Sequence, residues 1–342
     1  MKNTDSLWMN EALDLAAKAK GFTSPNPCVG AVLVKNQKVI GRGYHRKAGT
    51  PHAEVLAVRD ALRQGISPRG STLYVTLEPC CSHGRTPPCT DLIIREKIKR
   101  VVMGTLDPNP AHAGRAPRLL KKEGIEVTVG ILKEESSFLN RDFNHWIVQQ
   151  TPWVTLKSAM SYDGRITRPT GESSWLTGES ALEMAHELRG ECDAILVGAE
   201  TVRKDNPQLT VRHPRFKAKT QPWRVILTRS GKISSSANLL KNDPHQRTLI
   251  YQNKPLQEVL KDLGNRGVMN LLVEGGGEIH SAFLSEGLAH EVAIFWAPMM
   301  TGTSTWGFRF EGKNQIQKSI FLKPWWTGLI GNDLLVRALV QK

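Results

Sequence analysis

The chain has 342 residues, more than the ~100–200 typical of one domain, so we expect two domains with separate cores. Hydrophobic residues make up 40% of the sequence and charged residues 23%, which excludes long disorder, a collagen-like chain and a membrane bundle. No run approaches the ~18 apolar residues of a membrane-spanning helix, and the first residues lack the apolar core of a signal peptide. We therefore expect a globular, cytoplasmic protein with no membrane partner.

Lysine and arginine outnumber aspartate and glutamate by 46 to 32, a formal net charge of +14. This charge attracts anionic ligands such as phosphorylated small molecules and nucleic acids. The basic residues are dispersed, so the charge indicates a class of ligand without selecting one. The cysteines are an odd set crowded mostly into one segment: Cys28, Cys80, Cys81, Cys89 and Cys192. Such a pattern suits metal ligation better than the disulfides of secreted proteins.

The first half of the chain alternates between helical and strand-like patterns. Apolar spacing predicts helices at 10–20, 52–62 and 90–98. Apolar, β-branched runs predict strands at 29–34, 38–44, 73–77 and 101–104, the first two forming a hairpin. The alternation favours an α/β sheet covered on both faces, with a site at the carboxyl ends of the strands. Glu78-Pro79-Cys80 falls at such an end and is expected to open a further helical segment.

The second half repeats the alternation after a polar helical stretch that ends near Trp146. We place the domain boundary near 147–151, with domains at 1–148 and 149–342. Strands are predicted at 153–159, 194–197, 224–227, 248–251, 270–273 and 291–296, and a helix at 180–189. These elements predict a second α/β domain. The basic stretch 212–221 is expected to be loosely structured.

The strongest chemical signal is a set of metal-ligand residues in the first half. His52, Cys80 and Cys89 offer one imidazole and two thiolates, the ligand count of a catalytic zinc that keeps its fourth position open for water. Zinc lowers the pKa of a bound water to about 7, and Glu54, two residues after the histidine, is placed to relay its proton. His-x-Glu with Pro-Cys and a later Cys is the zinc deaminase signature. A purely structural zinc with Cys81 as fourth ligand is the alternative.

Three loops in this half resemble one family, the bifunctional riboflavin-biosynthesis deaminase-reductases. They are Thr23-Ser24-Pro25-Asn26-Pro27, Gly84-Arg85-Thr86-Pro87-Pro88-Cys89 and Asp107-Pro108-Asn109-Pro110. The resemblance covers nearly the whole chain and implies a cytidine-deaminase-like α/β/α zinc domain first. It implies hydrolytic deamination of 2,5-diamino-6-ribosylamino-4(3H)-pyrimidinone 5′-phosphate, with Asn26, His45 and Arg85 as candidate substrate contacts.

The spacing of the cysteines departs from most zinc deaminases, which separate them by two residues. Here eight residues lie between Cys80 and Cys89. The family commonly reads Pro-Cys-Ser-His, whereas this chain has Cys81 inserted before Ser82 and His83. We assign Cys80 as the ligand; a register slip of one residue would make it Cys81.

In the second half, the apolar run 271–273 leads into Glu274 and three glycines. Such a turn lets a pyrophosphate approach the start of the following helix. The resemblance implies a dihydrofolate-reductase-like domain that binds NADPH and reduces the ribosyl side chain of the deaminated product. By its matches, the residues facing the substrate are Ser173, Arg189, Leu209, Arg212 and Glu274. Those facing the cofactor are Ala159, Trp175, Thr201, Asp205, Gly276, Gly277, Glu278, Ile279, His280, Ser281 and Ala282.

Reduction needs a proton shuttle beside the hydride donor. Lys157 and Glu274 are the candidate catalytic residues, and a structural ion pair between these two is the alternative. Arg189 and Arg212 could hold the substrate phosphate. Thr228-Arg229 departs from the family's Asp-Ser step, which leaves the preference between NADPH and NADH open.

Two other functions compete with this interpretation. A zinc deaminase acting on a nucleic-acid base, with a basic RNA-binding second half, would also suit the charge. The long cysteine spacing and an aromatic content of 6% argue against it, so no nucleic acid is expected. A zinc-stabilised scaffold without activity would leave Glu54 unexplained. We expect a homodimer or homotetramer.

Overall fold

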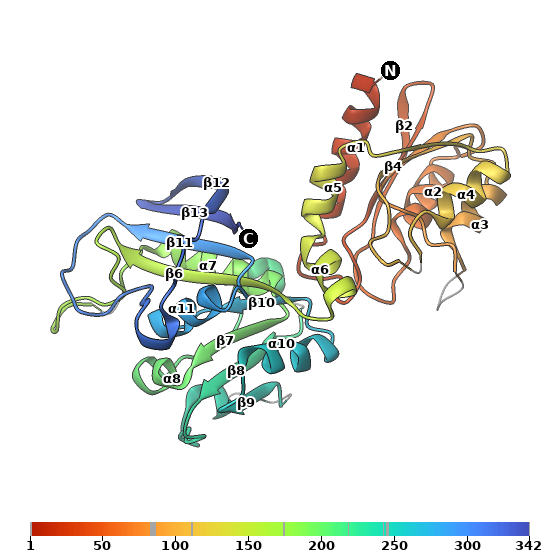
Figure 1. The fold of residues 1–342 in the computed structure, drawn as a ribbon. Coiled ribbons are helices and arrows are strands. Elements are labelled where there is room, and N and C mark those ends of the chain that lie inside the picture. The colour runs from red at the N-terminus through yellow and green to blue at the C-terminus, as the bar shows by residue number, and fades with distance from the viewer. Residues whose placement is uncertain are drawn as a thin grey trace. The chain divides into compact units, whose positions relative to one another are not determined.

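The computed structural model describes residues 2–82, 87–110, 112–173, 175–217, 219–241, 243 and 246–341, with side chains from residue 4 onward. The chain divides into two compact units, Met1–Gln150 and Thr151–Lys342, called here the N-terminal and C-terminal units (Figure 1). Among the described residues, no helix combines the length and apolarity needed to cross a membrane.

The N-terminal unit is built on a five-stranded sheet in the order β2-β1-β3-β4-β5. Its strands are β1 (Gly30–Lys35), β2 (Lys38–Tyr44), β3 (Thr72–Leu77), β4 (Arg100–Thr105) and β5 (Glu126–Val129). Its helices are α1 (Lys2–Ala17), α2 (Ala53–Arg63), α3 (Cys89–Arg95), α4 (Arg115–Lys122), α5 (Lys133–Leu139) and α6 (Arg141–Gln149). The β1–β2 hairpin is antiparallel, and β3, β4 and β5 run parallel.

Alternating side chains of the strands divide the core of this unit into two layers. Val32 and Val34 pack with α1 on one face of the sheet. Ala31 and Leu33 face the other side, where α2, α3 and α4 supply the apolar partners. The structure therefore confirms the predicted α/β/α arrangement, and its physical reason is the period of two along a strand buried on both sides.

Three elements of this unit differ from those predicted from the sequence. The first helix was predicted at 10–20 but spans Lys2–Ala17, because buried Asp5 is held by Tyr74 and Arg100 and brings the polar first turns into the fold. The polar stretch before Trp146 is two helices, α5 and α6, separated at Asn140. Glu78-Pro79-Cys80 opens no helix; α3 begins at Cys89 instead.

The C-terminal unit contains an eight-stranded sheet in the order β12-β13-β11-β6-β10-β7-β8-β9. Its strands are β6 (Trp153–Ser161), β7 (Ala194–Gly198), β8 (Trp223–Thr228), β9 (Thr248–Gln252), β10 (Asn270–Val273), β11 (Glu291–Ala297), β12 (Leu322–Ile330) and β13 (Asp333–Val340). Its α-helices are α7 (Glu179–Glu191), α8 (Ala199–Asp205), α9 (Asn238–Lys241), α10 (Leu256–Asn265) and α11 (Gly277–Ser285). Helices α10 and α11 pack on one face, and α7 packs on the other.

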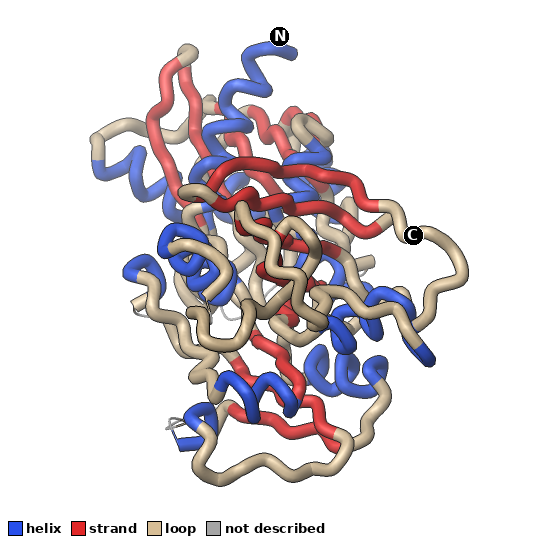
Figure 2. The backbone as a smooth tube through the Cα atoms, turned by 90° about the vertical axis from the view of Figure 1, so that its left-hand side faces the viewer, coloured by secondary structure: helices blue, strands red, loops and turns tan. Residues whose placement is uncertain are grey.

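The strands predicted from apolar runs are all present in this unit. Helices α8, α9 and α10 and the β12–β13 hairpin near the C-terminus (Figure 2) were not predicted from the sequence. The prediction of a loose segment at 212–221 was wrong in part. Phe216 is buried in a short 3-10 turn and packs over Gly190, where even a Cβ would clash with its ring.

Candidate active sites

The predicted metal ligands converge in the N-terminal unit. His52 is the N-cap of α2, Cys80 follows β3, and Cys89 is the first residue of α3. Nδ1 of His52 lies 3.3 Å from Sγ of Cys89 and 3.5 Å from Sγ of Cys80, and all three ligand atoms lie within 4.8 Å of one another. Cys81 does not belong to this group among the described residues. One nitrogen and two sulfurs at this separation fit a tetrahedral zinc with one position left for solvent.

Hydrogen bonds within this cluster shift the pKa values of its members in different directions. The Cys89 thiol hydrogen-bonds to Cys80 and, despite partial burial, lowers the pKa of the Cys80 thiol to about 4, with help from His52. The same contact between Cys80 and His52 raises the pKa of the imidazole. A thiolate sulfur and an imidazole nitrogen are the donor groups that zinc prefers.

Glu54 lies in the first turn of α2 and is only 3% exposed. Burial raises the pKa of its carboxyl, and its side chain hydrogen-bonds to Cys89. A carboxyl whose pKa is raised toward neutrality can both accept and return a proton. The helix thus brings the carboxyl of Glu54 beside the ligand cluster, where the His-x-Glu spacing placed it.

Two further predicted residues meet next to the metal cluster. Nε2 of His45 lies 3.1 Å from Nδ2 of Asn26, and its Nδ1 lies 3.3 Å from the carbonyl oxygen of Pro51. These partners indicate a neutral ring that donates from Nδ1 and accepts at Nε2. Burial lowers the pKa of His45, consistent with that state, and its ring meets that of His52 edge-on at 5.4 Å. Arg85 and His83 lie outside the described residues.

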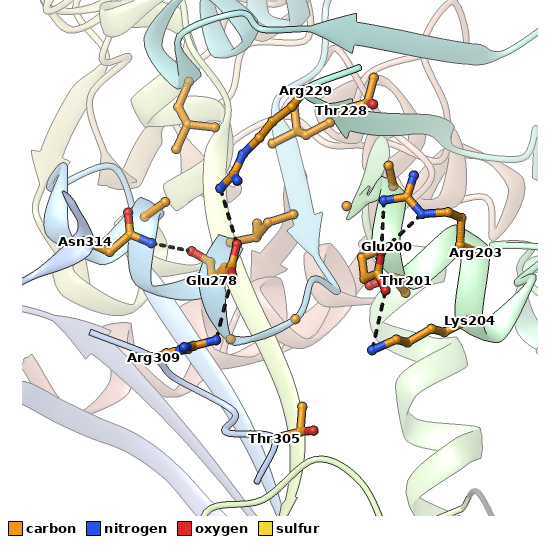
Figure 3. A pocket seen from close by; sticks show the side chains of 18 of the residues that line it. Glu200, Thr201, Arg203, Lys204, Thr228, Arg229, Glu278, Thr305, Arg309 and Asn314 are labelled. Atoms are coloured by element: carbon orange, nitrogen blue, oxygen red, sulfur yellow. Dashed lines mark hydrogen bonds and ion pairs between the residues drawn. The ribbon is translucent and has the colours of Figure 1, made fainter. Parts of the chain in front are cut away.

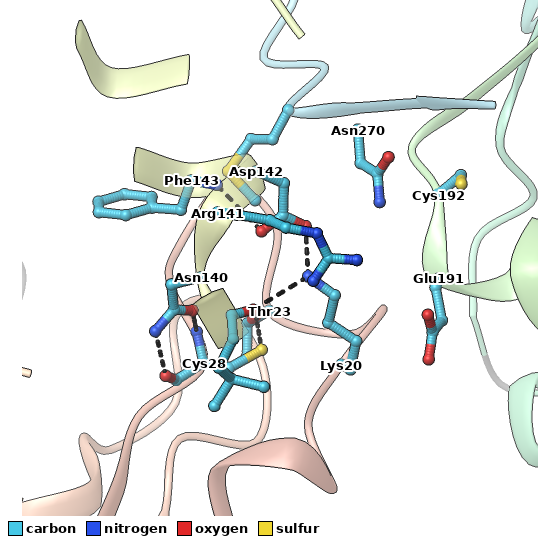
Figure 4. Close-up of polar contacts among 12 residues, drawn as sticks. Lys20, Thr23, Cys28, Asn140, Arg141, Asp142, Phe143, Glu191, Cys192 and Asn270 are labelled. Atoms are coloured by element: carbon cyan, nitrogen blue, oxygen red, sulfur yellow. Dashed lines mark hydrogen bonds and ion pairs between the residues drawn. The ribbon is translucent and has the colours of Figure 1, made fainter. Parts of the chain in front are cut away.

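The loop that carries Asn26 is anchored by buried polar contacts from α6 and the residue before it (Figure 4). Asn140 accepts from the backbone N–H of Cys28 at 2.7 Å and donates to its carbonyl at 2.8 Å. Lys20 forms an ion pair of 2.5 Å with Asp142, both nearly buried. Both ends of the loop are thereby fixed, which explains why α5 and α6 are interrupted at Asn140.

Glu78 is a structural residue of this site that the sequence analysis did not assign. Its buried carboxylate accepts three backbone hydrogen bonds, from Asp107, Gly114 and Ala116, at 2.9–3.1 Å. The loop after β4, which includes the Asp107-Pro108-Asn109-Pro110 motif, is thus fastened to the residue that precedes Pro79-Cys80. The only signal in the sequence was its place at the end of a predicted strand.

In the C-terminal unit, the candidate catalytic residues occupy neighbouring strands. Val273 pairs with Leu156 across β10 and β6, so Glu274 and Lys157 follow in register. Arg189 of α7 binds Glu274 through two contacts of 2.5 and 2.8 Å. Burial alone would raise the pKa of Glu274, but Arg189, with Lys157, lowers it to about 2. The ion pair considered for Lys157 and Glu274 is therefore formed by Arg189 instead.

Lys157 is left without the close carboxylate contact, and burial lowers the pKa of its ammonium although Glu274 opposes the shift. Its Nζ lies 5.6 Å from the centre of the Phe295 ring. A lysine with a lowered pKa can exchange a proton closer to neutral pH than an exposed one.

The other predicted substrate residues lie at different depths. Arg212 bonds to Thr210 at 2.8 Å and Gln208 at 3.1 Å, and its Nη2 lies 3.2 Å from Nε2 of His186. His186, three residues before Arg189 on the same helix, was missed by the sequence analysis. Leu209 is buried with a φ of 50°, and Ser173 is exposed, its hydroxyl accepting from the backbone of Trp175.

A cavity of about 1140 Å³ opens at the carboxyl ends of β7 and β8 and the start of α11 (Figure 3). The predicted cofactor residues that line it are Thr201, Asp205, Gly276, Gly277, Glu278, Ile279 and Ala282. A Cβ added at Gly276 would meet nothing within 4 Å, so the N-cap of α11 opens onto free space where a phosphate can approach. This lining fits a dinucleotide.

Four predicted cofactor residues do not line that cavity. His280 and Ser281 are buried on the inward side of α11, where His280 bonds to the carbonyls of Gly307 and Val273 and Ser281 accepts from the backbone of Arg309. Ala159 lies in β6 and Trp175 is 61% exposed. A helix turns its side chains to all sides, so a contiguous run cannot face one ligand.

Comparison with known proteins matches each unit separately. Residues 2–105 match the cytidine and deoxycytidylate deaminase zinc-binding region, and residues 152–334 match the RibD C-terminal domain. The riboflavin biosynthesis protein RibD of Aquifex aeolicus is 42% identical, and 98% of each chain is covered. RibD of Actinobacillus pleuropneumoniae is 39% identical, with coverage of 98% of this chain and 96% of that protein.

Solved structures agree with these matches over the full length. RibD of Acinetobacter baumannii has a TM-score of 0.88 at 36% identity and covers 100% of both chains. The diaminohydroxyphosphoribosylaminopyrimidine deaminase/5-amino-6-(5-phosphoribosylamino)uracil reductase of Thermotoga maritima has a TM-score of 0.88 at 36% identity and covers 99% of both.

The fold and the two sites define a two-domain enzyme, a zinc-site deaminase joined to a reductase. The chain belongs to the RibD family of riboflavin biosynthesis, as its loops indicated. Since residues 152–334 match the reductase domain of this family, the alternatives of an RNA-binding second half and an inactive scaffold are set aside.

Proposed function

We propose that the N-terminal unit deaminates 2,5-diamino-6-ribosylamino-4(3H)-pyrimidinone 5′-phosphate and that the C-terminal unit uses NADPH to reduce the product to 5-amino-6-ribitylaminouracil 5′-phosphate. The observation that carries the first step is buried Glu54 beside the His52, Cys80 and Cys89 cluster. The name of the Thermotoga maritima relative, whose chain is covered over 99% of its length, supports both steps.

In the deamination, water adds to the amine-bearing carbon and ammonia leaves, so one proton must move from water to the leaving nitrogen. Zinc held by the cluster supplies the electrostatic activation of that water. Glu54 takes the proton and returns it to the amine. Asn26 and His45 contact the base from the adjacent wall, and Arg85 is proposed to bind the phosphate as a charged, two-pronged donor.

In the reduction, the ribosyl ring opens to an electrophilic C1′ before hydride arrives from the nicotinamide. Lys157 is proposed to pass the proton that ring opening requires, because burial lowers its pKa. The Glu274–Arg189 ion pair orients the substrate. Arg212 binds the substrate phosphate, and Ser173 and Leu209 line the same part of the substrate site. Ala159, Trp175, His280 and Ser281 stay predictions for cofactor contact.

Glu54→Gln tests the proposed deaminase chemistry. Because the amide keeps the size of the side chain but cannot take up and return a proton, ammonia release should fall by about 10²–10⁴-fold. Bound zinc, measured by metal analysis of the purified protein, should stay near one equivalent in the variant and in the wild type. Deamination at wild-type rate by Glu54→Gln would refute the assignment.

The proposed reductase activity needs an assay of its own. Wild-type protein and Glu54→Gln are given the deaminated substrate with NADPH, and loss of the dinucleotide's near-ultraviolet absorbance is followed. Both should oxidise NADPH equally, whereas Lys157→Met should not. Absence of NADPH oxidation in the wild type would confine the activity to the N-terminal unit.

A further inference from the structure

Residues 211–221 form a closed loop on the C-terminal unit, described at 211–217 and 219–221. One side chain joins the two ends of this loop. The amide of Gln221 accepts from the backbone N–H of Val211 at 2.7 Å and donates to the carbonyl of Val211 at 3.2 Å. Val211 is buried, and the amide supplies both partners that its backbone requires. The next residue along the chain is Arg212, so this closure fixes the backbone beside it.

The middle of the 211–221 loop is docked on the last turn of α7. Nζ of Lys219 donates to the carbonyl oxygens of Gly190 and Cys192 at 2.6 and 2.8 Å. Carbonyls at the end of a helix lack partners within it, and a cation there also complements the helix dipole. Buried Phe216 lies against Gly190, where a Cβ would come within 2.2 Å of its ring. The loop is therefore held by polar and apolar contacts to the same helix end.

The basic residues of the loop differ in their partners. Arg215 is paired with Glu187 of α7 at 2.8 Å, and Lys219 binds the helix carbonyls. The exposed guanidinium of Arg212 instead meets a hydroxyl, an amide oxygen and an imidazole nitrogen. These neutral acceptors orient the guanidinium without cancelling its charge. Arg212 is thus held in a state suited to an anionic ligand.

Helix α7 is itself fixed to the sheet. Its Leu188 is buried in a core cluster with residues of β10, β11 and β13, and its Arg189 is bonded to Glu274 at the end of β10. His186 of the same helix contacts Arg212. The loop, the helix and the sheet therefore form one packed unit, which sets the position of Arg212 relative to Arg189.

We propose that the 211–221 loop holds Arg212 in a fixed position and that Gln221 and Lys219 are positioning residues for the reduction. The inference rests on the proposed function of the C-terminal unit, in which Arg212 binds the substrate phosphate. Both residues act through the guanidinium of Arg212 and not on the substrate itself. A guanidinium that is already oriented forms paired hydrogen bonds with a phosphate without first losing side-chain freedom.

The test is steady-state oxidation of NADPH by the full-length protein with the deaminated substrate. Gln221→Ala opens the loop and should raise KM for that substrate about tenfold. Lys219→Met leaves the loop closed and should raise KM about threefold or more. The kcat and the KM for NADPH should stay within about threefold, because a loss of uniform substrate binding changes KM alone. Gln257→Ala, at an exposed position of α10 outside the cavity lining, is the matched control and should change none of these values.

A double-mutant cycle shows whether Gln221 acts through Arg212. Arg212→Ala alone should raise KM for the substrate at least about tenfold. In the Arg212→Ala background, Gln221→Ala should then change KM by less than about twofold, because the group that it positions is already gone. A merely structural role of Gln221 would instead give the same effect in both backgrounds.

The remaining outcomes separate this inference from the proposed function. An unchanged KM in Gln221→Ala or Lys219→Met removes that residue from the positioning role, and an additive cycle overturns the action through Arg212. An unchanged KM in Arg212→Ala overturns the proposed phosphate contact, and a wild type that does not oxidise NADPH overturns the proposed reductase activity. Should Gln221→Ala fail to fold, the same cycle with Lys219→Met decides.

Discussion

Single side chains hold the loops and charged groups of each candidate site in position, and some of them lie outside the predicted ligand contacts. Glu78 satisfies three backbone N–H groups of the loop after β4 with one buried carboxylate. His186 stands between two arginines of the reductase site, bonded to one and close enough to the other to lower its own pKa. We expect both residues to act as positioning groups whose effects can be separated from catalysis.

Replacing Glu78 by glutamine removes the charge and leaves one oxygen for three donors. Because a buried donor left unpaired costs about 1–3 kcal/mol, the N-terminal unit should lose stability of that order. The loop should also loosen, so we expect KM for deamination to rise about tenfold while bound zinc is unchanged. Steady-state kinetics measures KM, and metal analysis measures bound zinc. An unaltered KM would show that Glu78 does not position the loop for substrate.

The pH dependence of stability should reveal His186. Burial, followed by the charges of Arg189 and Arg212, lowers the pKa of His186 to about 4, whereas an unfolded histidine titrates near ~6.5. Between these values the unfolded chain binds the extra proton, so stability present above pH ~6.5 is lost as pH falls toward 4. Urea unfolding of His186→Gln should show a smaller loss over this window than the wild type. An identical loss would show that His186 does not titrate in this way.

At the scale of elements, close packing of α2 on β2 places the deaminase site. His52 caps α2 and Glu54 lies in its first turn, so any shift of this helix moves the proposed metal ligand and the proposed proton carrier together. Gly43 of β2 faces that turn: a Cβ there would lie 2.3 Å from the carbonyl oxygen of Ala53 and 2.5 Å from the backbone nitrogen of Ala57. The helix sits where it does because β2 has no side chain at this point.

Gly43→Ala should therefore push the start of α2 away from the sheet. Overpacking of this kind costs about 1–3 kcal/mol, and we expect weaker zinc retention and a large loss of deamination. NADPH oxidation by the C-terminal unit should persist. Gly178→Ala is a suitable control, since its Cβ would meet only Asp333 at an ordinary 3.5 Å. Full zinc occupancy and activity in Gly43→Ala would contradict the packing argument.

At the scale of the whole molecule, each unit has its own core and its own site, which is why two family models divide the chain between them. One edge strand of the C-terminal sheet, β12, carries exposed apolar side chains. Strand β12 exposes Leu329 (72%) and Trp326 (37%), and Phe321 just before it is 68% exposed. An edge strand with exposed apolar side chains can pair with another chain, so we expect this edge to lie in the interface of the predicted homo-oligomer.

Gel filtration with light scattering tests this expectation. The wild type should elute as a dimer or tetramer, and Leu329→Lys should shift it toward the monomer, because a charge in the expected interface would be buried without a partner. Val148→Lys, at an exposed position of α6, is the control and should leave the mass unchanged. A monomeric wild type would refute the expectation.

The sequence by itself determined the local features and the chemistry they name. Strands buried on both faces appear as apolar runs. The His-x-Glu motif, with Pro-Cys and a later Cys, indicates a zinc deaminase because these residues lie at the ends of predictable elements. The helix α10 could also have been recognised, since Leu256, Val259, Leu260 and Leu263 recur at helical spacing and are buried. Periodicity and motif are properties of neighbouring residues, and a single chain displays them directly.

Only the tertiary structure decided which distant residues meet. Insertion of β10 between β6 and β7 brings Glu274 to Arg189 rather than to Lys157, and docking of the 211–221 loop on α7 sets Arg212 beside His186. Glu78 holds a loop that follows a different strand, for which no spacing rule exists. Strand order and register arise from the packing of the whole sheet, so the partners of charged residues cannot be read from the residues that flank them.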